Sequence, residues 1–425
     1  MKIIRTKGRG AQETAETIAA LEKRGGTSLD TVLPAVQRIV SDVRKKGDRA
    51  LAGYAAKFDG NEGILKVTPE EMAAAWEATP AAMRDALTTA AEQIRAFAVN
   101  QLPASWSEEP IPGLMTGQLV RPIGAAGCYV PSGRHPLPST LLMTVIPAQV
   151  AGVERIVVVS PKPAPETLAA AHLLGVTEFY RLGGAHAIAA LAYGTESIAS
   201  VDKIVGPGNL YVTAAKRLVA FDCAIDMLAG PTEAVVTSEK GQPADIASDL
   251  VAQAEHDPEA LSILVTTRAD LAKDVVAEAR LRCRKNPIAK AALDRNGLVI
   301  VAASVEEART ITNRLAPEHL TVDDSSDLDW VQNAGSVFIG RWSAQPMGDY
   351  ISGPNHTLPT GGMARVRGGL SVNDFVKLIT VQRYNGAAMK ALGPKAALLA
   401  EAEGLTGHAE AIRVRLTRKN RSPRD

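Results

Sequence analysis

The chain has 425 residues, of which 46% are hydrophobic and 22% charged, an ordinary composition for a globular protein with two or more domains. Its formal net charge of +1 provides no global field that would point to nucleic acid or a membrane surface as a partner. With no secretory signal, no apolar stretch long enough to span a bilayer and three widely separated cysteines, the chain is expected in the cytoplasm, without disulfides.

Helical patterns dominate the first hundred residues, for example at 31–46 and 80–99. From about residue 122, short β-branched runs alternate with Ala- and Leu-rich helical stretches. Buried strands of this length separated by helices indicate parallel sheets with right-handed crossovers, so the fold class is α/β. The strands are expected at 155–159, 234–237, 263–266, 298–301 and 337–339, and the helices at 167–175, 185–194, 210–221, 243–256 and 304–315.

The last fifty residues have a helical pattern again and end in a basic run at 413–425. This run has two interpretations. It could be an arm that binds nucleic acid, or a short strand or extended arm followed by a solvated terminus. The second interpretation is favoured, because short basic ends are common where no function requires them.

Four of the seven histidines lie beside acids or amides in the later part of the chain. The first of these is His256, three residues after Gln253 at the end of the helix expected from Pro243. Gln253 continues the apolar stripe of Ile246 and Leu250, and His256 shares that face. The pair indicates a metal site, although a helix-terminal His and Gln that cap their neighbours would fit the same pattern.

The second histidine is His319, which follows Glu318 just after Pro317 ends an amphipathic helix. A carboxylate and an imidazole at the mouth of a helix suit paired proton transfer, in which one group activates water and the other takes a proton from the substrate. A surface turn with two solvated polar groups is the alternative.

The third site is the segment 347–360, which follows the strand at 337–339 and is rich in glycine and proline. Loops at the carboxyl ends of parallel strands are where α/β proteins place their sites, and long polar loops in compact domains usually have a function. Asp349 and His356 are therefore candidates for metal and substrate contacts. His408, directly after a glycine, has the pattern of an ordinary helix-end residue.

The chain lacks a GxGxxG motif between a strand and a helix, which usually marks a nicotinamide site. The sequence GPGN at 206–209 follows a short apolar run and opens a helix, where backbone amides could meet a phosphate. Gly183 and Gly184 offer a similar turn before another helix. An ordinary strand-to-helix turn explains both segments equally well.

Taken together, the motifs resemble the histidinol dehydrogenase family over nearly the whole chain. The resemblance rests on GCYVP at 127–131, GGAHAIAALAYGTE at 183–196, GPGN at 206–209, DMLAGPTE at 226–233, QAEH at 253–256, LAPEH at 315–319, and the segments 348–360 and 403–408. It implies an enzyme that binds one zinc ion per subunit and oxidises L-histidinol through the aldehyde to L-histidine with two NAD, in histidine biosynthesis.

The resemblance also implies roles for individual residues. Zinc would be held by Gln253, His256, Asp349 and His408, and Glu318 and His319 would be the catalytic acid/base pair. Thr232, His356 and Glu403 would contact the substrate, and Tyr129, His186 and Asn209 would line the NAD site. The family forms homodimers in which the carboxy-terminal segment completes the partner's site. No nucleic acid and no membrane is implied as a partner.

The sequence departs from the family pattern at four positions. His186 stands where glutamine is expected, Ser132 replaces a glycine, Leu228 replaces a proline and Thr232 replaces a serine. Threonine keeps the hydroxyl as donor and acceptor, so little should change there. A titratable ring at position 186 could make NAD affinity depend on pH.

We expect two Rossmann-like parallel-sheet domains plus small helical or extended segments at both ends. The predicted divisions are an arm at 1–20, a larger domain combining helical 21–121 with 235–373, an NAD-binding domain at 122–234, and a dimerisation segment with a basic tail at 374–425. The metal and acid/base loops fall in the larger domain.

Three other functions are alternatives to the one that the resemblance implies. A dehydrogenase on the same scaffold could act on another polar alcohol, such as a sulfonated diol, although His356 and Glu403 suit an imidazole better than a sulfonate. A metallohydrolase could use the same metal and acid/base pair to activate water, but would have no use for NAD. A nucleic-acid binder would act through the basic tail, with salt-sensitive affinity.

Overall fold

A computed structural model describes residues 1–25, 29–63, 65–132 and 136–417. The chain divides into two compact units: the first combines Met1–Gln101 with Ile123–Phe375, and the second combines Leu102–Pro122 with Val376–Asp425. Within the described ranges, no helix combines the length and the hydropathy that crossing a bilayer requires. The first unit contains two six-stranded sheets, which are called sheet A and sheet B here.

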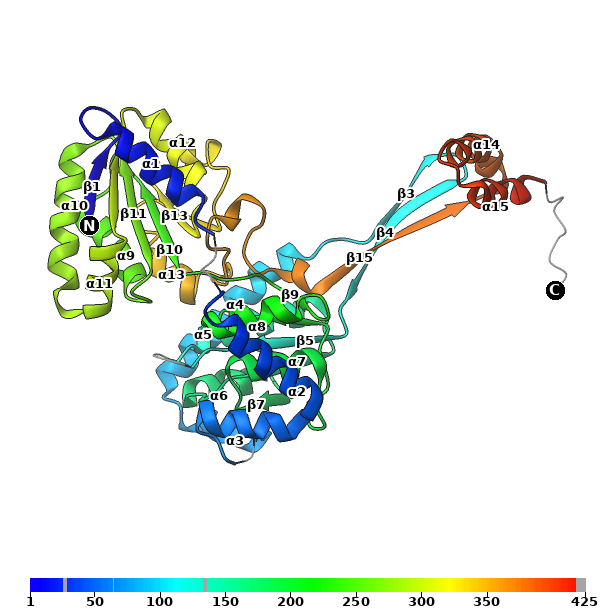
Figure 1. Cartoon of the computed structure of the whole chain (residues 1–425), viewed down its shortest axis with the longest axis horizontal. Helices are drawn as coiled ribbons and strands as arrows, with labels where there is room; N and C mark the ends of the chain where they lie inside the picture. Colours follow the sequence, from blue (N-terminus) through cyan, green and yellow to red (C-terminus); the bar gives the residue numbers. More distant parts are fainter. Residues whose placement is uncertain (26–28, 64, 133–135, 418–425) are drawn as a thin grey trace. The chain divides into compact units, whose positions relative to one another are not determined.

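Sheet A is parallel throughout, with strand order β1-β12-β11-β10-β13-β14 (Figure 1). Its strands are β1 (Lys2–Arg5), β10 (Glu233–Thr237), β11 (Leu261–Thr266), β12 (Leu298–Val301), β13 (His319–Val322) and β14 (Ser336–Ile339). The strands predicted in this part of the chain are confirmed. Two further strands, β1 and β13, complete the sheet.

Helices cover both faces of sheet A, because its strands alternate apolar side chains between the two sides. Leu264 of β11 packs in the core under α9 (Pro243–Ala254), α10 (Ala269–Arg282) and α11 (Pro287–Arg295). Its neighbours Ile263 and Val265 point into the opposite core. That core is closed by α1 (Ala11–Glu22) and α12 (Val305–Leu315).

The amino-terminal residues belong to sheet A, which corrects the prediction of a separate arm at 1–20. Strand β1 pairs with the edge strand β12 from Lys2↔Leu298 to Arg5↔Val301. Helix α1 contributes Ile18 to the core beside α12. A four-residue edge strand leaves too short an alternating pattern to be recognised in the sequence.

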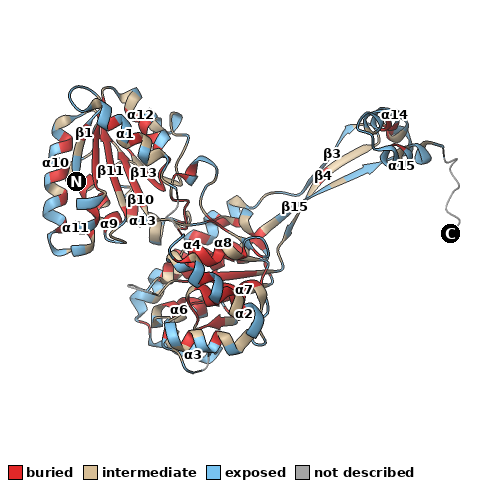
Figure 2. Cartoon of the chain, in the orientation of Figure 1, coloured by how far each residue is buried: buried red, intermediate tan, exposed pale blue. Residues whose placement is uncertain are grey.

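Sheet B has the order β2-β7-β6-β5-β8-β9 and is parallel except for β2. Its strands are β2 (Lys66–Val67), β5 (Ala125–Tyr129), β6 (Arg155–Val159), β7 (Glu178–Tyr180), β8 (Lys203–Val205) and β9 (Ala224–Ile225). The connecting helices are α5 (Pro138–Ala151), α6 (Pro165–Leu173), α7 (Gly184–Tyr193) and α8 (Leu210–Val219). The two sheets confirm the α/β fold class, and Figure 2 marks their strands as mostly buried.

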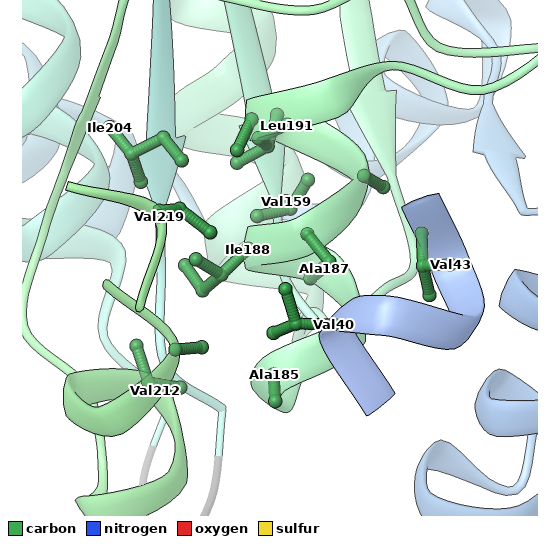
Figure 3. Packing of buried hydrophobic residues seen from close by; sticks show 14 of the residues in the cluster. Val40, Val43, Val159, Ala185, Ala187, Ile188, Leu191, Ile204, Val212 and Val219 are labelled. Carbon is green, nitrogen blue, oxygen red and sulfur yellow. The ribbon is translucent and has the colours of Figure 1, made fainter. Parts of the chain in front are cut away.

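Three early helices pack around sheet B. Helix α2 (Leu33–Tyr54) contacts α7 and α8, α3 (Pro69–Ala78) contacts α6, and α4 (Ala81–Gln101) contacts α5. Val40 and Val43 of α2 meet Ala187 and Ile188 of α7 in one core (Figure 3). The predicted grouping of 21–121 with 235–373 therefore differs from the structure. An apolar stripe defines which face of a helix is buried, but not which sheet it covers.

The second unit is an antiparallel sheet, β15-β4-β3, with two helices. Its elements are β3 (Trp106–Ile111), β4 (Leu114–Pro122), β15 (Val376–Tyr384), α14 (Gly386–Ala402) and α15 (Thr406–Thr417). The prediction that the last fifty residues are helical is wrong at β15, which pairs with all nine residues of β4. The strand or extended arm expected from 413 is wrong as far as residue 417, which ends a helix, and 418–425 lie outside the described residues.

Short helices complete the chain. They are the π-helix η1 (Ala55–Asp59), the 3-10 helices η2 (Cys283–Lys285), η3 (Ser325–Asp329), η4 (Met363–Arg365) and η5 (Val372–Phe375), and the short α-helix α13 (Gln345–Tyr350).

Candidate active site

Glu318 and His319 are buried at the start of β13, with 6% and 4% of their surfaces exposed. Helix α12 ends at Leu315, and Ala316 turns the chain with a positive φ of 47°, which few residues other than glycine adopt. After this turn Glu318 reaches the edge of the sheet and His319 forms its first β13 pair, with Ala234 of β10. The interpretation as a solvated surface turn is wrong.

The site residues gather at the amino ends of β10 and β13 in sheet A, whereas the segment 347–360 was expected at the carboxyl ends of the strands. Thr232 and Glu233 stand at the start of β10, beside His319 at the start of β13. The segment after β14 reaches this edge through α13, which brings Asp349 Oδ1 to 3.7 Å from His319 Nε2. Helix α13 returns the chain from the carboxyl end of β14 to the amino ends of the strands, and the sequence alone did not predict this return.

A series of hydrogen bonds connects four polar side chains of the site. Gln345 Nε2 donates to Gln253 Oε1, and Gln253 Nε2 donates to the hydroxyl of Thr232. That hydroxyl donates to Glu318 Oε2 over 2.6 Å, and the backbone N–H of Glu233 donates to the same oxygen over 2.8 Å. Each donor in the series points toward Glu318, so the hydrogen bonds fix the orientation of its carboxylate group.

His319 is held by the backbone of β10 on one side and by carboxylates on both sides. Its Nδ1 lies 3.2 Å from the carbonyl oxygen of Glu233 and 3.6 Å from Glu318 Oε2, while Nε2 faces Asp349. Burial lowers the pKa of His319, but the Glu318 and Asp349 carboxylates outweigh it and raise this pKa to about 10. His319 therefore holds its second proton more tightly than a free imidazole does.

His356 makes two hydrogen bonds within the protein. Its Nδ1 lies 2.8 Å from the carbonyl oxygen of Asp349, so this nitrogen carries the proton, and its Nε2 lies 3.1 Å from the Thr140 hydroxyl, which can donate. Burial lowers the pKa of His356 below its ordinary value despite the charge of Asp349. A substrate bound through Nε2 would have to replace the contact with Thr140.

Three of the four predicted zinc ligands, Gln253, His256 and Asp349, belong to the first unit, and the fourth, His408, belongs to the second. Gln253 is buried, as its periodicity predicted. The prediction that His256 shares this face is wrong, because α9 ends at Ala254 and His256 lies beyond it, exposed. Burial raises the pKa of Asp349, but His319, His356 and His256 outweigh it and lower this pKa. No group of three or more His, Cys, Asp or Glu side chains in the described part of the chain is arranged to hold a metal ion.

Two cavities adjoin these residues in the first unit. One, of about 330 Å³, is lined by His319, Asp349 and His356 together with Phe338 and Trp342. The other, of about 800 Å³, is mostly apolar; its lining includes His256, Glu255, Tyr350, Leu137, Pro138 and Leu87. Helix α13 contributes to both, since Asp349 lines the first cavity and Tyr350 the second.

The predicted NAD residues lie at the carboxyl edge of sheet B. Tyr129 ends β5, His186 lies in the first turn of α7 after β7, and Asn209 lies between β8 and α8. This is where doubly wound sheets bind nucleotides. His186 is 1% exposed and its Nε2 lies 2.8 Å from Asp59 Oδ2, so its ring is committed to the protein interior.

Side chains of the chain itself cap the two turns considered for phosphate binding. Asp59 accepts from the backbone N–H of Gly183, and the Tyr129 hydroxyl accepts from that of Gly184 over 3.2 Å. Asn209 accepts from the first backbone amides of α8. A phosphate would therefore have to displace a side chain at either turn.

Several residues of the site were missed by the sequence analysis. Gln345 and Thr140 bond to predicted site residues, and Glu233 contacts both Glu318 and His319 through its backbone. Glu233 ends the motif at 226–233, which was the only available signal for it. Gln345 and Thr140 lie in segments without a recognisable polar pattern.

The α/β fold with a buried carboxylate–imidazole pair, one member of which lines a cavity, is an arrangement suited to an enzyme that moves protons on a bound substrate. Residues 22–416 match the model of the family described as histidinol dehydrogenase. The chain is 48% identical over 414 residues to histidinol dehydrogenase of Geobacillus kaustophilus, an alignment that covers 92% of this chain and 98% of the relative. It is 46% identical over 413 residues to the histidinol dehydrogenase of Methanothermobacter thermautotrophicus, covering 94% and 97%.

A solved structure, that of histidinol dehydrogenase from Elizabethkingia anophelis, is similar over 98% of both chains, with a TM-score of 0.92 and 35% identity. The chain belongs to the histidinol dehydrogenase family. It is therefore an NAD-dependent oxidoreductase that acts on an alcohol and then on an aldehyde.

Proposed function

We propose that this protein is a zinc-dependent L-histidinol dehydrogenase of the cytoplasm, which converts L-histidinol through the aldehyde to L-histidine with two NAD. The family supports the oxidation of histidinol in histidine biosynthesis. The observation that carries the proposal is the buried pair of Glu318 and His319, connected through Thr232 to Gln253. The hydrogen bonds from Gln253 through Thr232 to Glu318 are a property of this structure and support the proposal in addition to family membership.

Zinc would be held by Gln253, His256, Asp349 and His408. The donors of this set are amide and carboxylate oxygens and imidazole nitrogens, which suit zinc and leave room for substrate atoms in its coordination shell. Gln253 is hydrogen-bonded to Gln345, one helical turn before Asp349 on α13, and His256 is close enough to influence the Asp349 carboxyl group. Three of the four donors thus lie near α13, which supports the assignment.

In this mechanism the protein holds and moves protons around the reacting carbon. Zinc held by these residues would orient and polarise the amino alcohol, and NAD would accept the electrons. Once His319 has released its second proton, it takes the hydroxyl proton of the substrate at Nε2, while Nδ1 keeps its contact with the carbonyl oxygen of Glu233. At the aldehyde stage Glu318 takes a proton from water, so that the hydrate can form and be oxidised in turn.

Thr232, His356 and Glu403 are proposed to contact the substrate, and Tyr129, His186 and Asn209 to line the NAD site. Thr232 is suited to this, because its hydroxyl already joins Gln253 to Glu318. The buried ring of His186 would act indirectly, through Asp59 and the turn at Gly183. A homodimer in which Glu403 and His408 complete the partner's site would explain why these two residues belong to a separate unit.

The competing substrate, a sulfonated diol, needs a cation to pair with its sulfonate. Neither lysine nor arginine appears among the described residues that line the cavity beside His319. That cavity therefore fits a neutral or cationic group such as an imidazole better than an anion.

The test is a spectrophotometric assay of purified protein with NAD and added zinc, offered either L-histidinol or a sulfonated diol. We expect reduced nicotinamide to form with L-histidinol, in a ratio of about two per molecule of histidinol consumed, as two successive oxidations require. Turnover of the sulfonated diol without turnover of L-histidinol would refute the proposed substrate. A metallohydrolase would show no NAD reduction with either compound.

A further inference from the structure

Glu233 holds both members of the acid/base pair with its backbone. Its N–H donates to Glu318 Oε2 over 2.8 Å, and its carbonyl oxygen lies 3.2 Å from His319 Nδ1. Once His319 has released its Nε2 proton, the second contact keeps the remaining proton on Nδ1 and leaves Nε2 as the base. Any displacement of this residue would therefore move Glu318 and His319 together.

The side chain of Glu233 is clamped by Arg24, from the segment just after α1. Arg24 Nε and Nη2 each lie 2.7 Å from one carboxylate oxygen of Glu233, a planar two-bond arrangement that only arginine can make. The two side chains are 15% and 4% exposed. The backbone N–H of Gly361 adds a third hydrogen bond to the carboxylate, at 2.9 Å.

The remaining donors of Arg24 extend the clamp to two helix ends. Its Nη2 also donates to the carbonyl oxygen of Leu315, the last residue of α12, over 2.7 Å. Its Nη1 donates to the carbonyl oxygen of Leu21 near the end of α1. One guanidinium thus ties together the start of β10 and the helix end from which Glu318 and His319 follow.

We propose that Arg24 is a positioning residue for the reaction, which acts through Glu233 to set the orientation of Glu318 and His319. Arg24 does not appear among the described residues that line either cavity beside the site, so it has no direct contact with a substrate there. The inference rests on the proposed catalytic roles of Glu318 and His319. It predicts a defect in turnover without a comparable defect in binding.

The double variant Arg24→Met with Glu233→Gln leaves no buried charge unpaired, because it removes both charges and keeps the approximate size of both side chains. Arg24→Ala alone leaves the Glu233 carboxylate without its cation, together with a space that added guanidinium can fill. Arg314→Ala is the matched control: Arg314 makes the same two-bond contact with Glu22, at 2.6 and 2.7 Å, between the same two helices. Arg314 contacts none of the site residues through its side chain.

We expect the double variant to lower kcat at least about tenfold while the KM values for L-histidinol and NAD change about twofold or less, because misplaced catalytic groups slow the chemical step. Guanidinium at millimolar concentration should restore part of the kcat of Arg24→Ala and leave Arg314→Ala unchanged. An unchanged kcat in the double variant, or equal effects in Arg24→Ala and Arg314→Ala, would overturn the proposal.

A second measurement does not depend on activity. In protein labelled with ¹⁵N-histidine, the His319 resonance should show a hydrogen-bonded Nδ1–H in the parent and in Arg314→Ala, and a weakened bond in the double variant. An identical His319 resonance in all three proteins would overturn the positioning role. If the parent has the resonance but no turnover of L-histidinol, the proposed function fails and the role of Arg24 stands on the resonance alone.

Discussion

Asp249 is a half-buried carboxyl group on α9, one helical turn before Gln253. It accepts a hydrogen bond from the backbone N–H of Gln345, but burial dominates and, with the neighbouring charge of Asp245, raises its pKa to about 6. The folded protein therefore binds a proton here more tightly than the unfolded chain does. Stability from this group is fully present below its ordinary pKa of 3.8 and is lost as the pH rises through about 6.

Asp249→Asn should consequently stabilise the protein at neutral pH but not in acid. We expect the melting temperature to rise by about 2 °C at pH 7.5, because the buried charge is gone and the amide oxygen still accepts from Gln345. At pH 4 the two proteins should melt together. Thermal unfolding at both pH values measures this, with Asp274→Asn, at an exposed carboxylate of α10, as the control. An equal gain at both pH values would contradict the titration argument.

The proposed zinc ligands make a separate prediction. Gln253→Ala and His256→Ala should each lower zinc affinity at least about tenfold and remove activity, because a missing ligand leaves a weaker coordination shell. Circular dichroism should stay unchanged. Bound zinc is measured by competition with a chromogenic chelator. His172→Ala, at an exposed histidine of α6, is the control and should keep both zinc and activity; full zinc content in all three variants would refute the ligand assignment.

At the residue scale, periodicity predicted the burial of Gln253 correctly, because a helix of known phase fixes which side chains face inward. It failed for Glu318 and His319, which had the pattern of a solvated turn. Their burial depends on pairing between β13 and β10, more than eighty positions apart in sequence. Local pattern contains no information on such a pairing, so the local sequence left the acid/base interpretation and the solvated turn both open, and only the family resemblance favoured the first.

Among the elements, helix α7 is buried on nearly all sides. Its residues from Ala185 to Ala192 lie in the core with α2 and α8, and Figure 3 places Ile188 between Val40 and Val219. Ile188→Ala should lower the free energy of unfolding by about 2–5 kcal/mol, since no neighbouring side chain can fill the space left by three carbons. Urea unfolding measures the difference.

Ile188→Val provides the graded control for this packing argument and should cost about 0.5–1.5 kcal/mol. If the alanine variant were no less stable than the valine variant, the core around α7 would have to be more adaptable than its complete burial indicates.

Elements with a strong local pattern were predicted, and those defined by distant partners were not. The strand at 155–159 is continuous and β-branched, and it appears as β6 with the same bounds. By contrast β15 is mostly exposed along its length, so it has no buried face whose alternation could be recognised. Its strand conformation comes from nine residues paired with β4.

For the whole molecule, the division into domains is discontinuous in a way that local patterns do not specify. Strand β1 and helix α1 join sheet A, the next three helices surround sheet B, and 102–122 join the carboxy-terminal segment. Each helix buries an apolar stripe, but more than one sheet has an apolar face against which that stripe could pack. The sequence therefore indicated two parallel-sheet domains correctly but assigned 21–121 to the wrong one.

The second unit exposes apolar side chains that a monomer would leave in water, among them Leu398 and Leu399, each 67% exposed. It also contains Glu403 and His408, which are proposed to complete a site in another subunit. A dimer formed through this unit would cover apolar surface and supply both residues at once. Exchange of subunits between two inactive variants tests that arrangement.

His319→Asn and His408→Asn should each be inactive as homodimers. In a mixed dimer, the site with an intact His319 would receive an intact His408 from the other subunit, so one of its two sites is whole. An equal mixture that exchanges freely should then regain about one quarter of the parental activity, because half of the dimers are mixed and each has one complete site. If His408 instead served its own subunit, every site in every dimer would lack one residue and the mixture would stay inactive.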